Sequence, residues 1–280
     1  MARTGRSYEE PGARPVAPAK LCPVRSPRWV LLGVAALVVL APGAGAAAAP
    51  PAPVVVLDPG HNGRNAAEPA AIRRPVPDGR GGMKACNTTG TATDAGYPEH
   101  AFNFDVATRV EQRLTAAGVR VVLTRPDDDG VGPCVDERGR AGETADAAAV
   151  VSIHADGAAP EASGFHVAYS DPPLNPVQAG PARDLATDLR DTLRRHGFPD
   201  ADYIGRDALS ARSDLAGLNH ATRPTVLVEC ANMRNAAEAE LVSSPDGRER
   251  YAAAIADGVL AFLERDAATG TRRTGAAHQP

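Results

Sequence analysis

Short apolar runs alternate with amphipathic helical patterns along most of this 280-residue chain. The apolar residues 54–57 stand between prolines, and residues 148–153 and 225–229 form similar runs, as expected for strands buried on both faces of a sheet. Between these runs, apolar residues recur at helical spacing in residues 99–117 and 182–196. The alternation predicts an α/β fold of three layers, in which helices flank a mostly parallel, twisted sheet in a single domain.

The same patterns place further elements along the chain. We expect strands at residues 119–124 and 164–170, and helices at residues 136–145 and 251–263. Asn235, with Glu238 three residues later, forms a capping-box pattern for the start of one more helix.

The first 46 residues have the pattern of a secretory signal peptide. A basic segment precedes an apolar run at residues 29–40, and the small residues Ala44-Gly-Ala46 follow as a cleavage site. The run is shorter than the roughly 20 residues that span a membrane, and an uncleaved anchor is the alternative. We expect secretion to the periplasm or the cell wall, with no stable membrane anchor after processing. A folded domain at residues 53–264 and a disordered tail at residues 265–280 complete the expected organisation.

The chain is acidic once the signal is removed. The first 46 residues hold six of the 30 Lys and Arg residues and two of the 34 Asp and Glu residues, so the remainder carries a net charge of −8. This charge argues against nucleic acid or other polyanions as partners. The length between signal and tail suits one domain with one core, and we expect a monomer.

Three cysteines remain after processing, and export places them where disulfides persist. Cys86 and Cys134 lie in long glycine-rich connections, and pairing them would close a loop of 48 residues. The chain-entropy model values such a closure at roughly 4 kcal/mol. Cys230 lies in a predicted buried strand, where a packed free thiol is expected. We predict a Cys86–Cys134 disulfide, with three free thiols as the alternative.

Four reactive side chains stand at the ends of predicted elements: His61, Glu99, His154 and Glu229. In an open α/β sheet, sites form beyond the carboxyl ends of the strands, so these residues can meet at one rim. His61, Glu99 and His154 form a three-ligand set for zinc that leaves a position open for water. Glu229 closes a buried strand and is the candidate general base. Taken singly, each has an ordinary alternative, such as a surface histidine or a glutamate at a helix start.

These residues lie in motifs that resemble those of the amidase-3 family, the zinc-dependent N-acetylmuramoyl-L-alanine amidases. The resemblance extends over residues 54–263. The sequence departs from the family pattern at Ala231 and Asn232, which stand where the family usually has Gly-Phe after the glutamate. We expect this change to affect the shape of the substrate groove. The matching motifs are Leu57-Asp-Pro-Gly-His61, Glu99-His-Ala-Phe-Asn103, Thr124-Arg125, Ser152-Ile-His-Ala-Asp156 and Leu227-Val-Glu-Cys-Ala-Asn-Met-Arg-Asn235.

The resemblance implies a secreted peptidoglycan hydrolase. Residues 53–264 would be its catalytic domain, with one Zn²⁺ held by His61, Glu99 and His154 and with Glu229 as the catalytic base. Its substrate would be peptidoglycan or a muropeptide, cleaved between N-acetylmuramic acid and the L-alanine of the stem peptide. Further candidates for ligand support or substrate binding are Asp58, Asp156, Arg125, His166 and Asn235.

Some alternatives stay open at this point. Asp58 either orients a ligand histidine or stabilises its turn, and a core or surface role is the alternative for His166, which has no partner at metal-ligand spacing. Another zinc peptidase or deacetylase of the cell wall would use the same site. A non-catalytic wall-binding or activator protein on this fold is a further alternative, against which an intact Glu229 argues.

Overall fold

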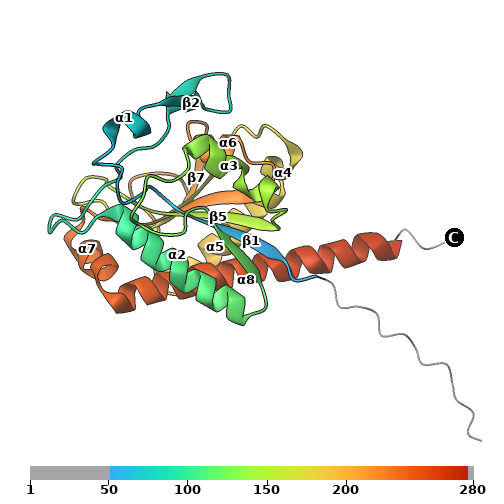
Figure 1. Cartoon of the computed structure of the whole chain (residues 1–280). Helices are drawn as coiled ribbons and strands as arrows, with labels where there is room; N and C mark the ends of the chain where they lie inside the picture. Colours follow the sequence, from blue (N-terminus) through green and yellow to red (C-terminus); the bar gives the residue numbers. More distant parts are fainter. Residues whose placement is uncertain (1–50, 277–280) are drawn as a thin grey trace, which may run out of the picture. The chain divides into compact units, whose positions relative to one another are not determined.

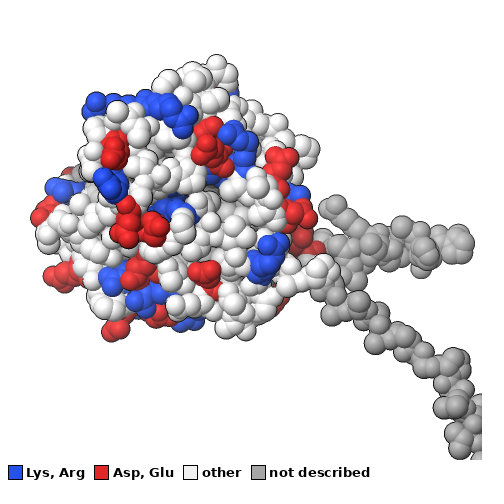
Figure 2. All heavy atoms as spheres, viewed as in Figure 1, with Lys and Arg blue, Asp and Glu red and all other residues white. Residues whose placement is uncertain are grey.

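The computed structural model describes residues 51–276 and the side chains of residues 51–269. The predicted signal peptide at residues 1–46 therefore lies outside the described residues. Within the described part of the chain, no helix combines the length and apolar character needed to cross a membrane. On the face drawn in Figure 2, acidic and basic side chains are interspersed.

A six-stranded sheet forms the centre of the domain. It follows the spatial order β4 (Arg120–Leu123), β1 (Val54–Pro59), β5 (Ala149–Asp156), β8 (Thr225–Asn232), β6 (His166–Ser170) and β7 (Leu209–Arg212). The first four strands of this order are parallel to one another, β6 is antiparallel to β8, and β7 is parallel to β6. The mostly parallel sheet predicted from the sequence is confirmed.

Helices cover both faces of this sheet (Figure 1). One layer consists of α2 (Glu99–Ala116), α5 (Pro181–Arg195) and α8 (Pro245–Ala276), whose apolar side chains pack on the sheet in the main core. The other layer includes α3 (Val135–Thr144) and α6 (Ala216–Asn219), which pack on β1, β5, β6 and β8 through smaller clusters. The remaining short helices are α1 (Pro69–Ile72), α4 (Pro176–Ala179) and α7 (Ala236–Ser243).

The main core forms where the helical periodicity predicts it. Phe102, Val106, Val110 and Leu114 of α2 are all fully buried. Tyr251 of α8 packs edge-on against Phe102, with ring centroids 5.9 Å apart, and it also stacks on the Phe198 ring. These contacts fix one layer of helices against the sheet.

Successive side chains of a strand point to opposite faces of the sheet, so the core residues and the site residues of one strand lie on different faces. In β8, Val226 and Val228 enter the main core, and Leu227 packs on the opposite face of the sheet. Glu229 follows at the same alternation as Leu227, and His154 stands beside it in register on β5. The site residues of the strands therefore point to the face that carries α3 and α6.

The long connection between β1 and α2 contains structure that the sequence patterns did not reveal. It folds into α1 and a hairpin of β2 (Pro75–Pro77) and β3 (Met83–Ala85). A disulfide joins Cys86, directly after this hairpin, to Cys134 before α3, and Cys230 is buried and free. Both expectations for the cysteines are confirmed.

The carboxyl-terminal helix differs from the prediction. α8 continues to Ala276, whereas the sequence indicates disorder from residue 265. No proline or glycine interrupts residues 259–269. The Arg265 guanidinium also reaches α5, where its Nη2 lies 2.7 Å from Asp188 Oδ2. A continued backbone ladder and this ion pair keep the segment helical where the apolar periodicity has already ended.

Candidate active site

Two histidines and a glutamate meet at the carboxyl end of the parallel strands. His61 follows β1, His154 lies in β5, and Glu99 is the first residue of α2. Glu99 Oε2 lies 3.1 Å from His61 Nε2, and Glu99 Oε1 lies 2.9 Å from His154 Nδ1. One ligand atom from each residue lies within 4.8 Å of the other two. The chain thus brings together the three residues that the sequence predicts as a metal site.

The turn after β1 allows the two histidine rings to approach each other. Gly60 has no side chain, and a Cβ atom there would stand 2.1 Å from the His154 ring. His61 itself has a φ of 58°, in the left-handed region that residues with side chains rarely adopt. The two imidazole rings pack edge to face, with centroids 4.9 Å apart. This close approach requires glycine at position 60.

Glu99 is a buried carboxylate held ionised by its neighbours. Its Oε2 accepts from the Thr91 N–H at 2.9 Å, and Oε1 accepts from Asn103 Nδ2 at 3.3 Å. Burial alone would raise its pKa, but hydrogen bonds from His154 and His61 and the charges of these histidines hold the pKa well below the usual range. An ionised carboxylate is the form that ligates a cation.

The donor set fits a zinc ion. Two imidazole nitrogens and one carboxylate oxygen are the ligands of open zinc sites, which keep one position for water or substrate. A cavity of about 240 Å³ adjoins both histidines. Its walls are mostly apolar, including Val150, Leu218 and Leu227. The two histidines and Glu99 would therefore hold a metal next to this cavity.

Glu229 stands next to this group with an unsatisfied carboxyl. On β8 it is in register with His154 on one side and with His166 on the other. Its Oε2 is buried and has no hydrogen-bond partner within the described residues. Burial, together with the charges of Glu99 and Asp156, raises the pKa of Glu229 well above its usual value, against a weaker opposing effect of Arg212. Such a carboxyl binds a proton more readily than an exposed one.

Asp58 lies beneath the site in an ion pair that the sequence did not predict. Its Oδ1 accepts from Arg138 Nη1 at 2.6 Å and from Thr124 Oγ1 at 2.6 Å, and Oδ2 accepts from Ser152 Oγ at 2.7 Å. Burial alone would raise the pKa of Asp58, but Arg138 and the two hydroxyl groups lower it to about 2. Arg138 also donates to the His61 carbonyl at 2.9 Å. These are the contacts of a turn-stabilising aspartate, and no hydrogen bond joins Asp58 to a ligand histidine in the described chain.

Arg125 and Asn235 have structural contacts. Arg125 is buried and donates to the carbonyl oxygens of Pro59, Asp127 and His100. The Asn235 side chain caps α7, where it accepts from two backbone N–H groups of the first turn. Among the described residues, neither side chain has a hydrogen bond or an ion pair with His61, Glu99 or His154.

Asp156 and His166 form a small polar cluster beside Glu229. His166 is fully buried, and its Nε2 lies 3.4 Å from Asp156 Oδ2. Tyr203 donates its hydroxyl to the same oxygen at 3.2 Å. The hydrogen bond from His166, and further hydrogen bonds that outweigh the effect of burial, lower the pKa of Asp156. Tyr203 and Arg138 are among the site neighbours that the sequence patterns missed, because neither stands in a motif or at a predicted strand end.

The fold and the site together define a class: a hydrolase with a mostly parallel sheet whose rim can hold one metal ion. Within that class the chain belongs to the N-acetylmuramoyl-L-alanine amidase family, whose profile matches residues 55–261. The family indicated by the sequence motifs is therefore confirmed.

Mycobacterial proteins are among its similar relatives. The N-acetylmuramoyl-L-alanine amidase Rv3717 of Mycobacterium tuberculosis is 50% identical over 210 residues, which cover 75% of this chain and 86% of that protein. The crystal structure of the amidase Ami1 from Mycobacterium smegmatis superposes with a TM-score of 0.75 at 52% identity, covering 77% of this chain and 98% of Ami1. Ami1 from Mycobacterium abscessus gives a TM-score of 0.74 at 50% identity, with 76% and 99% covered.

Proposed function

We propose that this protein is a zinc-dependent amidase of peptidoglycan. It cleaves the amide bond between N-acetylmuramic acid and the L-alanine of the stem peptide, in peptidoglycan or in a muropeptide. The observation that carries the proposal is the group of His61, Glu99 and His154 with Glu229 beside it. Its family and its mycobacterial relatives, which are N-acetylmuramoyl-L-alanine amidases, support the choice of substrate.

Each residue has a defined task in this reaction. His61 Nε2, His154 and the ionised Glu99 would hold one Zn²⁺, which when bound polarises the scissile carbonyl and acidifies the attacking water. Glu229 accepts a proton from this water as the new C–O bond forms. It then returns the proton to the nitrogen as the C–N bond breaks. The products are the lactyl carboxylic acid of the glycan and the free amine of L-alanine.

The raised pKa of Glu229 suits a group that both takes and gives a proton. A carboxylate with an ordinary pKa would bind the proton of water only weakly, whereas burial and the neighbouring carboxylates make Glu229 more basic. A divalent cation on the neighbouring ligands would partly offset this increase. A catalytic task also explains a buried carboxyl oxygen without a partner, which a non-catalytic binding protein would have no reason to keep.

We also propose that the enzyme acts outside the cytoplasm as a monomer. A basic segment, a short apolar run and a small-residue cleavage site at residues 1–46 support export by a cleaved signal peptide. The Cys86–Cys134 disulfide is consistent with an oxidising compartment. Residues 53–264 would then act as the catalytic domain.

The test is digestion of purified muropeptides with and without a metal chelator, followed by mass spectrometry. We expect release of stem peptides that begin with L-alanine, about one zinc per protein molecule, and loss of both zinc and activity in His61→Ala and His154→Ala. Cleavage within the peptide would indicate a zinc peptidase, and loss of acetyl groups a deacetylase. Unchanged zinc content in the double variant His61→Ala/His154→Ala would exclude the metal site.

A further inference from the structure

The orientation of His61 depends on a carbonyl group from a distant loop. The Thr88 carbonyl oxygen lies 3.0 Å from His61 Nδ1, and the Thr88 hydroxyl oxygen lies 3.3 Å from the same nitrogen. Because a carbonyl only accepts, Nδ1 carries the proton and donates it. The lone pair is then on Nε2, the nitrogen that faces Glu99. The position of Thr88 therefore decides which nitrogen of His61 can bind a metal.

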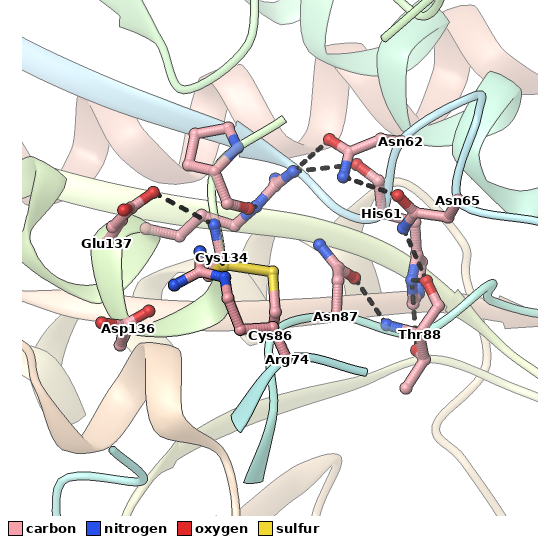
Figure 3. The surroundings of a disulfide bond; sticks show 12 residues. His61, Asn62, Asn65, Arg74, Cys86, Asn87, Thr88, Cys134, Asp136 and Glu137 are labelled. Atoms are coloured by element: carbon pink, nitrogen blue, oxygen red, sulfur yellow. Dashed lines mark hydrogen bonds between the residues drawn. A yellow bond between two sulfur atoms is a disulfide. The ribbon is translucent and has the colours of Figure 1, made fainter. Parts of the chain in front are cut away.

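Thr88 is held in place two residues after the disulfide (Figure 3). Cys86 bonds to Cys134, and both are almost fully buried. The Cys86 N–H donates to the Arg74 carbonyl at 2.8 Å, and the Cys86 carbonyl accepts from the Val135 N–H at 2.9 Å. The covalent bond and these two hydrogen bonds leave the segment that carries Thr88 little freedom to move.

A side chain on the other side of the loop completes this support. Asn65 donates its Nδ2 to the Thr88 carbonyl at 2.7 Å, while its Oδ1 accepts from Asn62 at 2.9 Å. The Thr88 carbonyl thus lies between the ligand His61 and Asn65, as Figure 3 shows. Of these contacts, only the disulfide ties the loop covalently to another element.

The start of α3 supports His61 in two ways, indirectly through the Thr88 loop and directly at the His61 backbone. Cys134 is the N-cap residue of α3 and fixes the Thr88 loop through the disulfide. Arg138, one turn later in the same helix, donates to the His61 backbone carbonyl at 2.9 Å. This second contact holds a residue whose φ of 58° is unfavourable without support. Both the ring and the backbone of His61 therefore depend on one helix end.

We propose that the Cys86–Cys134 disulfide positions the metal ligand His61 through Thr88 and thereby sets the affinity of the site for zinc. The proposal rests on the proposed function, because it takes His61 as a ligand. Residues that orient a ligand histidine typically change metal affinity by about 10–100-fold. A disulfide that only stabilised the fold would change unfolding and leave the zinc affinity of the folded protein unaltered. In this protein the oxidised state is the one that retains the metal well.

The experiment measures the zinc dissociation constant of the folded full chain by competition with a chromogenic chelator. In Cys86→Ser/Cys134→Ser we expect about tenfold weaker zinc binding or more, with an unchanged circular dichroism spectrum. Asn65→Ala keeps the disulfide and loses one support of the Thr88 carbonyl, so we expect weaker zinc binding there as well. Arg64→Ala alters the exposed neighbouring residue and should bind zinc like the wild type.

A second control separates positioning from stability. Ile255→Val removes one methyl group from the fully buried core of α8, far in sequence from the loop, and should lower the melting temperature without changing zinc affinity. Zinc binding within about twofold of wild type in the folded double-serine variant would overturn the proposal, as would an equal loss in Ile255→Val. If the double-serine variant does not fold, Asn65→Ala takes its place, and zinc binding within about twofold of wild type in Asn65→Ala would overturn the proposal. A wild-type protein that binds no zinc would instead refute the proposed function.

Discussion

The pKa values of the two glutamates at this rim are shifted in opposite directions. Hydrogen bonds from two histidines lower the pKa of Glu99 despite its burial, whereas burial and the charge of Glu99 raise the pKa of Glu229. Carboxyl groups whose environments push their pKa values apart commonly divide ligand and acid–base tasks. The structure thus gives a physical reason for the roles proposed for these two side chains.

Glutamine substitutions should separate these roles. Glu99→Gln should weaken zinc binding, because zinc prefers a carboxylate oxygen to the neutral oxygen of an amide. Glu229→Gln is nearly isosteric, so it should keep zinc and the fold yet lower turnover by roughly 10²–10⁴-fold, the usual contribution of a positioned acid–base group. The measurements are metal content and release of the stem peptide from a muramyl peptide. Near wild-type turnover with full zinc in Glu229→Gln would remove Glu229 from the mechanism.

The buried pair of Asp58 and Arg138 makes stability depend on acid pH. The pKa of Asp58 is lowered to about 2 in the folded protein, below its unfolded value of about 3.9. Its contribution, on the order of 2 kcal/mol, is therefore complete above about pH 4 and is lost as the pH falls toward 2. Asp58→Asn should be about 3–5 kcal/mol less stable at pH 7, since Arg138 stays buried without a countercharge.

Denaturant unfolding of both proteins at pH 7, 4 and 2.5 tests this pH dependence. The difference in the free energy of unfolding between wild type and Asp58→Asn should shrink at the lowest pH. Asp94→Asn, at an exposed ion pair, should differ little from wild type at any pH. A difference at position 58 that does not vary with pH would contradict the argument.

Residues at strand ends were predictable from the sequence, and their supports were not. His61, His154 and Glu229 could be placed together because parallel strands present their carboxyl ends at one rim. Arg138 and Thr88 act through contacts between an irregular loop and a helix start, which no periodicity specifies. Sequence alone allowed Asp58 to support the turn or a histidine, and it did not indicate the hydrogen bonds that the structure shows from Arg138, Thr124 and Ser152.

At the scale of elements, long periodic segments were predicted well and short ones were missed. α2 and α5 follow their apolar stripes to within a residue or two. β2, β3 and β7 have three or four residues each and, unlike the equally short β4, contain no run of apolar residues. β8 extends past Glu229 to Asn232, because strand pairing with β5 resumes beyond an irregularity that a sequence pattern does not reveal.

The capping box predicted at α7 forms only in part. Asn235 caps the helix, but Glu238 accepts instead from the Gly164 and Asn232 N–H groups at 2.9 and 2.8 Å. The Glu238 side chain therefore makes tertiary hydrogen bonds in place of the local hydrogen bond of a capping box. Glu238 links α7 to β8 and to Gly164, two residues before β6.

Loss of the cap should have a modest effect on stability. Asn235→Ala leaves two N–H groups of the first turn of α7 without the side-chain acceptor, so we expect a loss of about 1 kcal/mol. Asn235→Asp, which keeps an acceptor at this position, should restore most of it. Thermal unfolding at matched pH and zinc concentration measures both. Lower turnover at unchanged stability in Asn235→Ala would indicate the substrate role considered from the sequence.

At the scale of the whole molecule, one covalent link closes a loop of 48 residues. Non-reducing peptide mapping of exported protein should recover Cys86 and Cys134 in one linked pair and Cys230 as a free thiol. Labelling of Cys230 should require unfolding, since its side chain is buried. Alkylation of all three cysteines without reduction would contradict this assignment. Reduction should increase hydrogen exchange in residues 62–98 more than in the sheet.

The amino-terminal end of β1 lies at the end of the sheet opposite the rim, because the carboxyl end of β1 leads to His61. Six residues of strand place the entry point about 20 Å from the site. A carrier protein, a surface-display anchor or a resin coupled ahead of Pro51 would thus leave the rim open to a bulky polymer. The domain is in this respect suited to immobilisation through its amino-terminal side, and soluble and insoluble wall fragments could be compared on one tethered enzyme.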